Sequence, residues 1–572
     1  TKGIIYNIQS LDSWLYDSNP TTHLQYEETI NKLRTNIDTG YFENFIKERI
    51  INNSHSSLVI INPKKGLGEE KDNILEEKLT KYKNSLNEKE IETLIDENQK
   101  LKNMQLSEDT EEAKATIPKL SISDVESKAQ IIPQEIIKDE NYTLLFHNIF
   151  TSKIAYTDFY FDISMVDEEL IPYISLLTGI IGKVDTKTMN YSELSNEIYV
   201  NTGGIDFNTN VFTENGNDEI YHPKFIIQGK AIGNNVVRLI ELINELITNS
   251  KIEDEKRIKK LIQQIKSRIE MSIFDMGHSA TSNRVGSYFS PSRKYMERLK
   301  GIDFYWFVSD ILEDFDNNSE KIISNLNKVY SRIFNINNLI ISFTGDKEDF
   351  FLVKDNLKII TENISKEKLE PIEYTFSEQK SNEGILSSAN VQYVSKGYNF
   401  KKLGYEYNGS MRVLATILNG DYLHNRIRAQ GGAYGAGISF DRTGNVTTFS
   451  YRDPNLKETI NAYDGMSDYI KNLSLSESEL TTYIIGTMSR LDPAITPHMK
   501  GQIATSRYIS KISQDEVQNT RDKVLNTKLE DIKSFAPLLR ETMVKDYLCV
   551  LGNENKIKEN KDIFGKLVKL MK

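Results

Sequence analysis

The stretch DYLHNRIRAQGGAYGAGISF, residues 421–440, indicates how the chain is organised, because the chain contains a second version of it. The earlier stretch YSELSNEIYVNTGGIDFNTN, residues 191–210, matches it when one residue is gapped. The apolar and amide positions that then coincide are Leu194, Asn196 and Ile198 with Leu423, Asn425 and Ile427. Because solenoid repeats have periods of only about 20–50 residues, a repeat on this scale indicates two duplicated domains of about 200 residues each.

The same kinds of element surround each double-glycine stretch. In the second copy, residues 388–400 alternate as a strand, 411–428 have the spacing of an amphipathic helix, and 445–455 form a strand ended by Pro454. Strands and helices are mixed without the strict alternation of parallel α/β folds. The sequence therefore predicts an α+β fold with two tandem homologous modules, each a mostly antiparallel sheet packed with helices.

Runs of apolar and β-branched residues that end in a turn with Gly or Pro mark the last strand of each module. They occupy residues 56–66, 338–350 and 546–558. No full module precedes the first run, so we expect the chain to open with the end of another module. The predicted domains are the end of a preceding α+β domain at 1–66, a linker at 67–118, a third domain at 119–365 and a fourth at 366–572.

The linker is polar and helix-prone. One narrow apolar stripe includes Leu75 and Leu79, and a second begins at Ile91. Between them, Ser85 and Glu88 have the spacing of a capping box, in which the hydroxyl accepts from the third amide and the carboxylate reaches back. We therefore predict an antiparallel helical hairpin.

Composition limits the classes of function. The 572 residues carry 71 basic and 82 acidic side chains, and the net charge of −11 argues against a nucleic-acid footprint. No apolar run approaches the ~18 residues of a membrane span. The single cysteine, Cys549, excludes an internal disulfide and a multi-thiolate metal site, which fits a reducing, cytoplasmic location. The chain begins without a Met or a signal-like segment, so we expect it to start inside a longer parent, and a targeting segment upstream stays an alternative.

Several common catalytic motifs are absent from the sequence. None of the seven histidines can form HExxH or the inverse HxxEH, so no helix presents the paired imidazoles of a zinc protease. There is no Walker A loop, and GGAYGAG has the order GxxGxG followed by a strand, which does not fit a dinucleotide cradle. A GxSxG nucleophile elbow is also missing.

Residues 421–455, DYLHNRIRAQGGAYGAGISFDRTGNVTTFSYRDPN, resemble the C-terminal half of the presequence-protease and falcilysin type peptidases. These are a branch of the insulinase-like, or pitrilysin-like, metallopeptidases that use an inverted zinc motif. Residues 3–20 resemble the end of that family's second domain, 67–118 its hairpin linker and 283–311 its third domain. The resemblance thus extends over nearly the whole chain and makes the predicted α+β domains insulinase-type domains.

The resemblance implies that two halves of one enzyme contribute different parts of the active site. In the family, the N-terminal half carries HxxEH with a distant glutamate and holds the zinc, while the C-terminal half closes over it to form a chamber for unfolded peptides. The C-terminal half also contributes an arginine and a tyrosine to the active site, which correspond to Arg428 and Tyr434. This chain lacks the zinc motif, so we expect it to bind no metal, to be inactive alone, and to act with an N-terminal half as its partner.

The chemistry of these residue types agrees with that implication. Amide hydrolysis develops negative charge on the carbonyl oxygen, and the Tyr434 phenol is the candidate donor to it. Arg428 offers a fixed fork of donors for peptide carbonyls or a carboxylate, so it would position the substrate. Gly431, Gly432 and Ala433 are candidate substrate-binding residues, because glycines let another backbone approach and an extended peptide could add a strand there.

Two other interpretations stay open. The double glycine is first of all a turn, since the earlier copy has Tyr199 or Val200 opposite Arg428 and no tyrosine after its glycines. The second alternative is a non-catalytic peptide-binding or processing-complex subunit of the same fold. An HxxEH motif upstream of Thr1 would favour the enzyme. Arg452, in the turn after the last strand of the motif, is a weaker candidate for the chamber wall.

Overall fold

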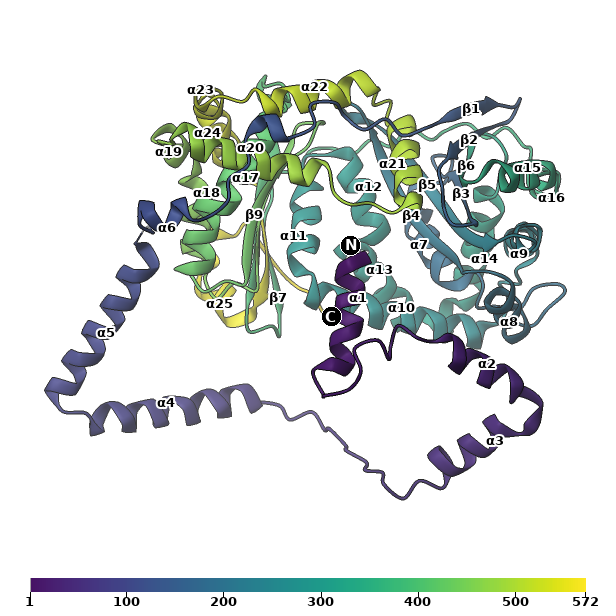
Figure 1. Ribbon diagram of the computed structural model, residues 1–572, viewed down its shortest axis with the longest axis horizontal. Helices are drawn as coiled ribbons and strands as arrows, with labels where there is room; N and C mark the ends of the chain where they lie inside the picture. Colours follow the sequence, from purple (N-terminus) through teal and green to yellow (C-terminus); the bar gives the residue numbers. More distant parts are fainter. Residues whose placement is uncertain (1, 108, 572) are drawn as a thin grey trace. The chain divides into compact units, whose positions relative to one another are not determined.

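A computed structural model describes residues 2–107 and 109–571. The chain divides into two compact units, Thr1–Thr116 and Ile117–Lys572 (Figure 1). None of the helices described is both long and apolar enough to cross a membrane.

The regular elements of the first unit, over its described residues, are all helices. Its helices are α1 (Lys2–Trp14), α2 (Glu27–Thr35), η1 (Ile37–Thr39), α3 (Tyr41–Ile46), η2 (Lys47–Ile51), α4 (Leu67–Ser85), α5 (Glu88–Leu106) and α6 (Glu111–Ala115). The strand predicted within 56–66 is not formed, and Leu58 and Ile61 are 86% and 89% exposed. A strand is held by hydrogen bonds to a neighbouring strand, and the described part of this unit offers none.

Both linker helices form, but the capping box lies two residues later than predicted. Asn87 Oδ1 accepts a hydrogen bond from the Glu90 amide at 3.0 Å, and the Glu90 carboxylate accepts from the Asn87 amide at 2.8 Å. Ser85 ends the preceding helix instead, where its hydroxyl donates to the Tyr82 carbonyl. Most apolar side chains described on the two helices, Leu75, Leu79 and Ile95 among them, are exposed, so their packing as a hairpin stays a prediction.

The second unit contains two six-stranded sheets, each drawn from one of the two modules. The first has the order β1-β2-β6-β3-β5-β4 and the second β12-β7-β11-β8-β10-β9. The strands are β1 (Glu135–Lys138), β2 (Tyr142–Asn148), β3 (Ile154–Asp162), β4 (Ile205–Glu214), β5 (Asn217–Ile232), β6 (Leu339–Gly345), β7 (Asn382–Ser387), β8 (Gln392–Asn399), β9 (Gly435–Phe440), β10 (Asn445–Tyr451), β11 (Leu548–Asn553) and β12 (Lys566–Lys569).

Helices pack on these sheets, which confirms the predicted α+β class. Those of the first module are η3 (Ile122–Asp124), η4 (Glu168–Leu170), α7 (Ile171–Ile180), α8 (Tyr191–Asn201), α9 (Asn235–Asn249), α10 (Glu255–Asp275), α11 (Gly277–Gly286), α12 (Pro291–Lys300), α13 (Ile302–Glu313), α14 (Phe315–Ile333), α15 (Lys347–Asn356) and α16 (Lys358–Thr361). Those of the second are η5 (Phe400–Leu403), α17 (Met411–Ile417), η6 (Leu418–Ala429), α18 (Lys457–Asp464), α19 (Met466–Lys471), α20 (Glu477–Leu491), α21 (Pro497–Ile509), α22 (Gln514–Leu525), α23 (Leu529–Ser534), α24 (Ala536–Val544), α25 (Glu554–Glu559) and η7 (Lys561–Ile563).

Five of the six strands repeat one topology in the two sheets, and the outer strands differ, since β1 is antiparallel to β2 and β12 is parallel to β7. In each, the module's first long strand pairs in parallel with its late strand, β2 with β6 and β7 with β11, and most other neighbours are antiparallel. The strands that follow the double glycines, β4 and β9, are both edge strands. Leu194 and Leu423, aligned in the sequence repeat, are both fully buried. The duplication predicted from the sequence is therefore present in the fold, while the predicted domain limits stay predictions.

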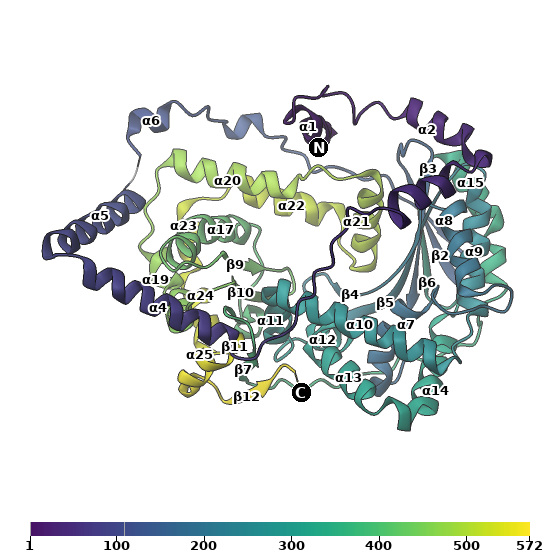
Figure 2. The same cartoon turned by 90° about the horizontal axis from the view of Figure 1, so that it is seen from below.

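The modules exchange one helix each across their contact (Figure 2). Helix α11 of the first module packs on β8, β10 and β11, and α21 of the second module packs on β6. Both approach through a glycine: a Cβ at Gly277 would overlap the ring of Tyr393, and one at Gly501 would overlap the Thr344 hydroxyl. Each module therefore covers the second face of the other's sheet, which explains why residues 117–572 form one unit.

A threonine one turn after each glycine adds a polar contact. Thr281 Oγ1 lies 2.8 Å from Ser395 Oγ on β8, and Thr505 Oγ1 lies 2.8 Å from Ser342 Oγ on β6. Thr505 also contacts the buried His147, whose Nδ1 is 3.0 Å from the Pro133 carbonyl. Burial lowers the pKa of His147, so the ring is neutral near neutral pH and donates from Nδ1.

A buried arginine joins the exchanged helix α11 to the second sheet. Arg284 Nε donates to Glu383 Oε2 at 2.7 Å, and its NH1 donates to Glu297 at 3.2 Å and to Asp303 at 2.5 Å. Tyr288 adds a hydrogen bond to Glu383 at 2.7 Å. Burial alone would raise the pKa of Glu383, but the hydrogen bonds and charge of Arg284 hold it below its usual range.

Arg284→Met is expected to destabilise the fold by about 3–5 kcal/mol, because it removes the guanidinium that the buried carboxylates of Glu297 and Glu383 share, although Lys566 stays 3.5 Å from Glu383. The measurement is urea-induced unfolding of the full chain. Arg238→Met is the matched control: its partners Glu197 and Glu241 lie at the surface, so the change should cost about 1 kcal/mol or less. Equal losses in the two variants would contradict the role of Arg284 as the buried link.

Candidate active-site surface

A wide helical turn leads into the double glycine. The segment η6 ends at Ala429, and the chain then folds back through hydrogen bonds from Gly432 N to Arg428 O at 2.9 Å and from Ala433 N to Ile427 O at 3.0 Å. Gly432 has φ +78°, a left-handed conformation that glycine adopts without strain. The sequence therefore needs a glycine here for the turn itself.

Gly431 is needed for a second reason. A Cβ at this position would lie 2.6 Å from the Ile427 carbonyl oxygen, which is backbone and cannot move aside. The Asn455 side chain donates to the Gly431 carbonyl at 2.5 Å and so ties the turn to the end of β10. Ala433 is buried in the core and its N–H is already bonded, so a substrate contact at Ala433 would have to use its carbonyl oxygen.

This turn brings Arg428 and Tyr434 together at the surface. The guanidinium carbon of Arg428 lies 5.7 Å from the centre of the Tyr434 ring, within cation–π range. Tyr434 is 67% exposed, and its backbone N–H bonds to the Tyr451 carbonyl at 3.0 Å. Among the described residues, neither the Tyr434 hydroxyl nor the Arg428 guanidinium has a hydrogen-bond or ion-pair partner, so both are available to a ligand.

Sequence reasoning missed two neighbours of this pair, Tyr451 and His278. The Tyr451 ring meets that of Tyr434 edge-on at 5.7 Å and that of His278 at 4.8 Å. His278 comes from the exchanged helix α11, so no local pattern in the sequence could place it here. Its Nδ1 is buried without a partner among the described residues, and burial lowers its pKa, so the imidazole is neutral near neutral pH.

Arg452 also reaches this surface. It has φ +48°, its guanidinium carbon lies 5.4 Å from the Tyr451 ring, and its NH2 lies 3.8 Å from Asp275 Oδ1. The turn that carries it is fixed by buried Asp453, which accepts hydrogen bonds from Thr459 and from the Asn455 amide. The predicted strand end and turn over this segment are confirmed, and Arg452 lies beside the candidate residues.

The edge strand β9 limits how a peptide could add to the sheet. Asn419 donates to the Ile438 carbonyl at 3.1 Å and accepts from the Ile438 amide at 2.7 Å. This position of the edge is therefore already paired within the chain. A peptide strand would have to pair nearer to Gly435, which is also the end of β9 closest to Tyr434.

No metal centre accompanies these residues. Among residues 2–107 and 109–571, no group of three or more His, Cys, Asp or Glu side chains is placed to hold a metal ion. What the described arrangement can do chemically is donate hydrogen bonds from a phenol and a guanidinium beside an aromatic wall.

Two family models match the sequence. Residues 61–311 match a domain described as associated with the peptidases of family M16, subfamily C. Residues 382–552, which include Arg428 and Tyr434, match the "PreP C-terminal domain". The two matches together cover most of the chain.

Curated relatives match over almost the whole chain. It is 40% identical over 570 residues to "Protein HypA" of Clostridium perfringens, covering 100% of this chain and 58% of that protein. It is 29% identical over 548 residues to "Presequence protease 1, chloroplastic/mitochondrial" of Arabidopsis thaliana, covering 94% of this chain and 50% of that protein. The chain thus spans between half and three fifths of the length of these relatives.

Solved structures show the same fold at low identity. A conserved protein from Enterococcus faecalis superposes with a TM-score of 0.53 at 14% identity, covering 74% of this chain and 99% of that one. The peptidase M16 inactive domain from Pseudomonas fluorescens gives 0.51 at 13% identity, covering 73% and 97%.

Gly431→Ala is expected to destabilise the chain by about 1–3 kcal/mol, because the new methyl must displace the Ile427 carbonyl and so shift the turn before Tyr434. The measurement is chemical denaturation of the full chain. Gly420→Ala, in the helical segment that precedes the turn, is the control, since nothing lies within 4 Å of its Cβ. A stable Gly431→Ala protein would show that the turn tolerates a side chain there.

Proposed function

The chain belongs to the presequence-protease-like M16 peptidases, as the C-terminal half of such a protein, and from this premise we propose that it completes the active site of a peptide-hydrolysing enzyme. The observation that carries the proposal is the pairing of Arg428 with Tyr434, side by side, exposed and without partners among the described residues. Two side chains that only stabilise the fold would not need unpaired hydrogen-bond donors next to each other at the surface.

The two side chains would act on the substrate in different ways. A peptide carbonyl gains negative charge when it is attacked, and the Tyr434 hydroxyl is a neutral donor that can meet that charge. Arg428 would bind a neighbouring carbonyl or a carboxylate through its fork of N–H groups, so it is a positioning residue. The aromatic ring of Tyr451 supports Tyr434 from the side.

Zinc would be supplied by another polypeptide segment. The described residues of this chain do not fit a metal site, so we propose that zinc is held by an N-terminal half with HxxEH. When bound there, the metal would supply Lewis-acid activation of water or of the carbonyl. This half would close the chamber over unfolded peptides and contribute Arg428 and Tyr434 to the active site. A cytoplasmic location of the protein is a separate proposal.

A non-catalytic role has one observation in its favour. The described chain has an edge strand and free donors, and no group of three or more candidate metal ligands, which is also what a peptide-binding subunit would need. The two functions predict different results when a metal-carrying partner is added: peptide cleavage for the enzyme, and peptide binding without cleavage for the binding subunit.

The isolated chain is expected neither to retain zinc nor to cleave an unfolded peptide. Addition of the HxxEH-containing half should restore cleavage, because the donors and the metal then meet. Metal analysis and a fluorogenic peptide assay measure both quantities. Undiminished peptide binding with no cleavage in the mixture would support the binding subunit instead.

In the complete enzyme, Tyr434→Phe is expected to lower kcat by about 100-fold or more with a much smaller change in KM, because the lost hydrogen bond forms mainly in the transition state. Steady-state kinetics measure the split. Tyr199→Phe is the control, since it removes the hydroxyl of another exposed tyrosine, one in the first copy of the repeat. Wild-type turnover by the Tyr434→Phe enzyme would exclude the phenol as the oxyanion donor.

A further inference from the structure

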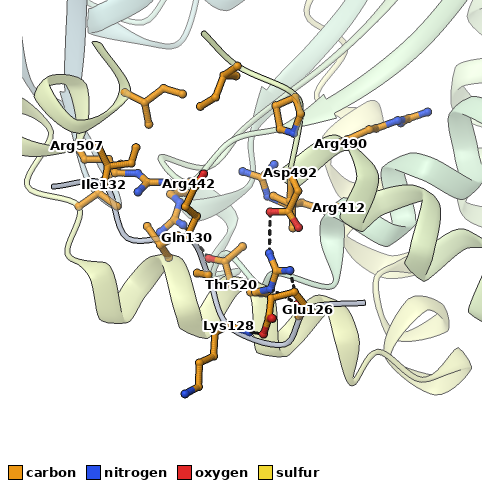
Figure 3. A pocket seen from close by; sticks show the side chains of 18 residues that line it. Glu126, Lys128, Gln130, Ile132, Arg412, Arg442, Arg490, Asp492, Arg507 and Thr520 are labelled. Carbon is orange, nitrogen blue, oxygen red and sulfur yellow. Dashed lines mark hydrogen bonds and ion pairs between the residues drawn. The ribbon is translucent and has the colours of Figure 1, made fainter. Parts of the chain in front are cut away.

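A cavity of about 710 Å³ opens in the second unit, between residues 126–132 and helices α20 to α22. Its wall is unusual for its charge: five arginines and a lysine line it, against two acidic residues (Figure 3). The arginines are Arg412, Arg442, Arg490, Arg507 and Arg521. This excess of positive charge stands out in a chain whose net charge is −11.

Only one of the five arginines has an acidic partner among the described residues. Arg521 is buried and pairs with Asp492 at 2.8 Å, while its other nitrogens donate to the Glu126 carbonyl. This arginine therefore has a structural role: it fixes the segment before β1 against α22. The charge of Asp492 is used by this pair.

Three other arginines form a row of like charges. Arg412 uses its Nε to bind the Tyr407 hydroxyl at 3.0 Å, and Arg442 uses NH2 to bind the Thr520 hydroxyl at 2.8 Å. The Arg507 guanidinium has no hydrogen-bond or ion-pair partner among residues 2–107 and 109–571. In Figure 3 the side chains of Arg442 and Arg507 converge near Gln130, whereas Arg490 and Lys128 extend away from them.

These arginines are close enough to repel one another. Burial is the main cause that lowers the pKa of the Arg442 guanidinium; the charge of Arg412 lowers it as well, while Tyr407 and Glu516 act in the opposite direction. Burial lowers the pKa of Arg507 as well, with the charge of Arg442 as the second cause. Glu516 offsets part of the charge of Arg442, but Arg412 and Arg507 have no acidic partner among the described residues. Half-buried like charges that are only partly neutralised are unfavourable in the folded state, so an anion placed among them would stabilise the folded chain.

We propose that this cavity, which we call the arginine cavity, binds a small molecule with two or more linked phosphate groups. The guanidinium forks of Arg412, Arg442 and Arg507 retain most of their N–H donors, and such forks bind phosphate oxygens in pairs. Two linked phosphates offer more acceptor oxygens than one, so they can engage more of the three forks at once. The cavity volume lies within the range of about 300–1,000 Å³ that small-ligand sites occupy.

The rest of the wall fits a compact ligand of this kind. Apolar side chains also line the wall, Ile132 and Ile503 among them, and a partly apolar surrounding strengthens the attraction between guanidinium and phosphate. The site does not include Arg428 or Tyr434, so it does not depend on the proposed peptidase role. A phosphate-bearing effector rather than a peptide substrate is the class that this wall would select.

The test is calorimetric titration of the full chain with pyrophosphate, with orthophosphate as the single-phosphate comparison. Pyrophosphate should bind saturably and orthophosphate much more weakly. Arg442→Gln and Arg507→Gln should each weaken pyrophosphate by about tenfold or more, since each removes a charge-assisted donor pair. Arg540→Gln, an exposed arginine outside the cavity wall, should leave the affinity unchanged.

A second measurement separates loss of the site from loss of the fold. Without ligand, Arg507→Gln should raise the Tm slightly, because it relieves repulsion, whereas with pyrophosphate the unchanged protein should gain more stability than the variant. The proposal is overturned by an absence of saturable binding, by equal affinities for orthophosphate and pyrophosphate, or by equal weakening in Arg540→Gln. It is also overturned if an oligoglutamate peptide competes more strongly than pyrophosphate with the same arginine dependence.

Discussion

The exchange of helices α11 and α21 is the contact on which the rest of the second unit depends. Gly277 and Gly501 let each helix lie directly on the sheet of the other module, and Thr281 and Thr505 each make a hydroxyl contact one turn later. A sheet with one bare face would expose its apolar side chains to water, so neither module is complete alone. The duplication thus produced a mutually dependent pair rather than two independent domains.

The candidate active-site surface depends on the same exchange. Arg428 and Tyr434 are set by their own turn, but the aromatic wall behind them ends on His278, which α11 brings from the first module. The first module has an equivalent turn before β4 and no such pair of donors. The turn was therefore a structural feature of both copies, and only one copy acquired the side chains that could act on a peptide.

The arginine cavity has a different origin from that surface. Arg442 follows β9 and Arg507 belongs to α21, so the cavity is also assembled by elements around the exchanged helix. Its like charges oppose folding locally, whereas Arg284 and its carboxylates show the opposite arrangement, a buried cation fully surrounded by anions. Arg284 is neutralised by carboxylates and so links elements of the fold. Arg412 and Arg507 have no acidic partner among the described residues, so they are candidates to bind a ligand.

The sequence by itself determined the duplicated α+β modules, the late strands β6 and β11, and the turn that carries Arg428 and Tyr434. These follow from local periodicity and from glycines whose conformation is set within a few residues. Residues 56–66 failed as a strand because a strand needs a partner, and the capping box moved to Asn87 because neighbouring polar residues compete for one helix end. Only the tertiary structure decided the helix exchange, the place of His278 and the arginine cavity, since each joins residues far apart in the chain.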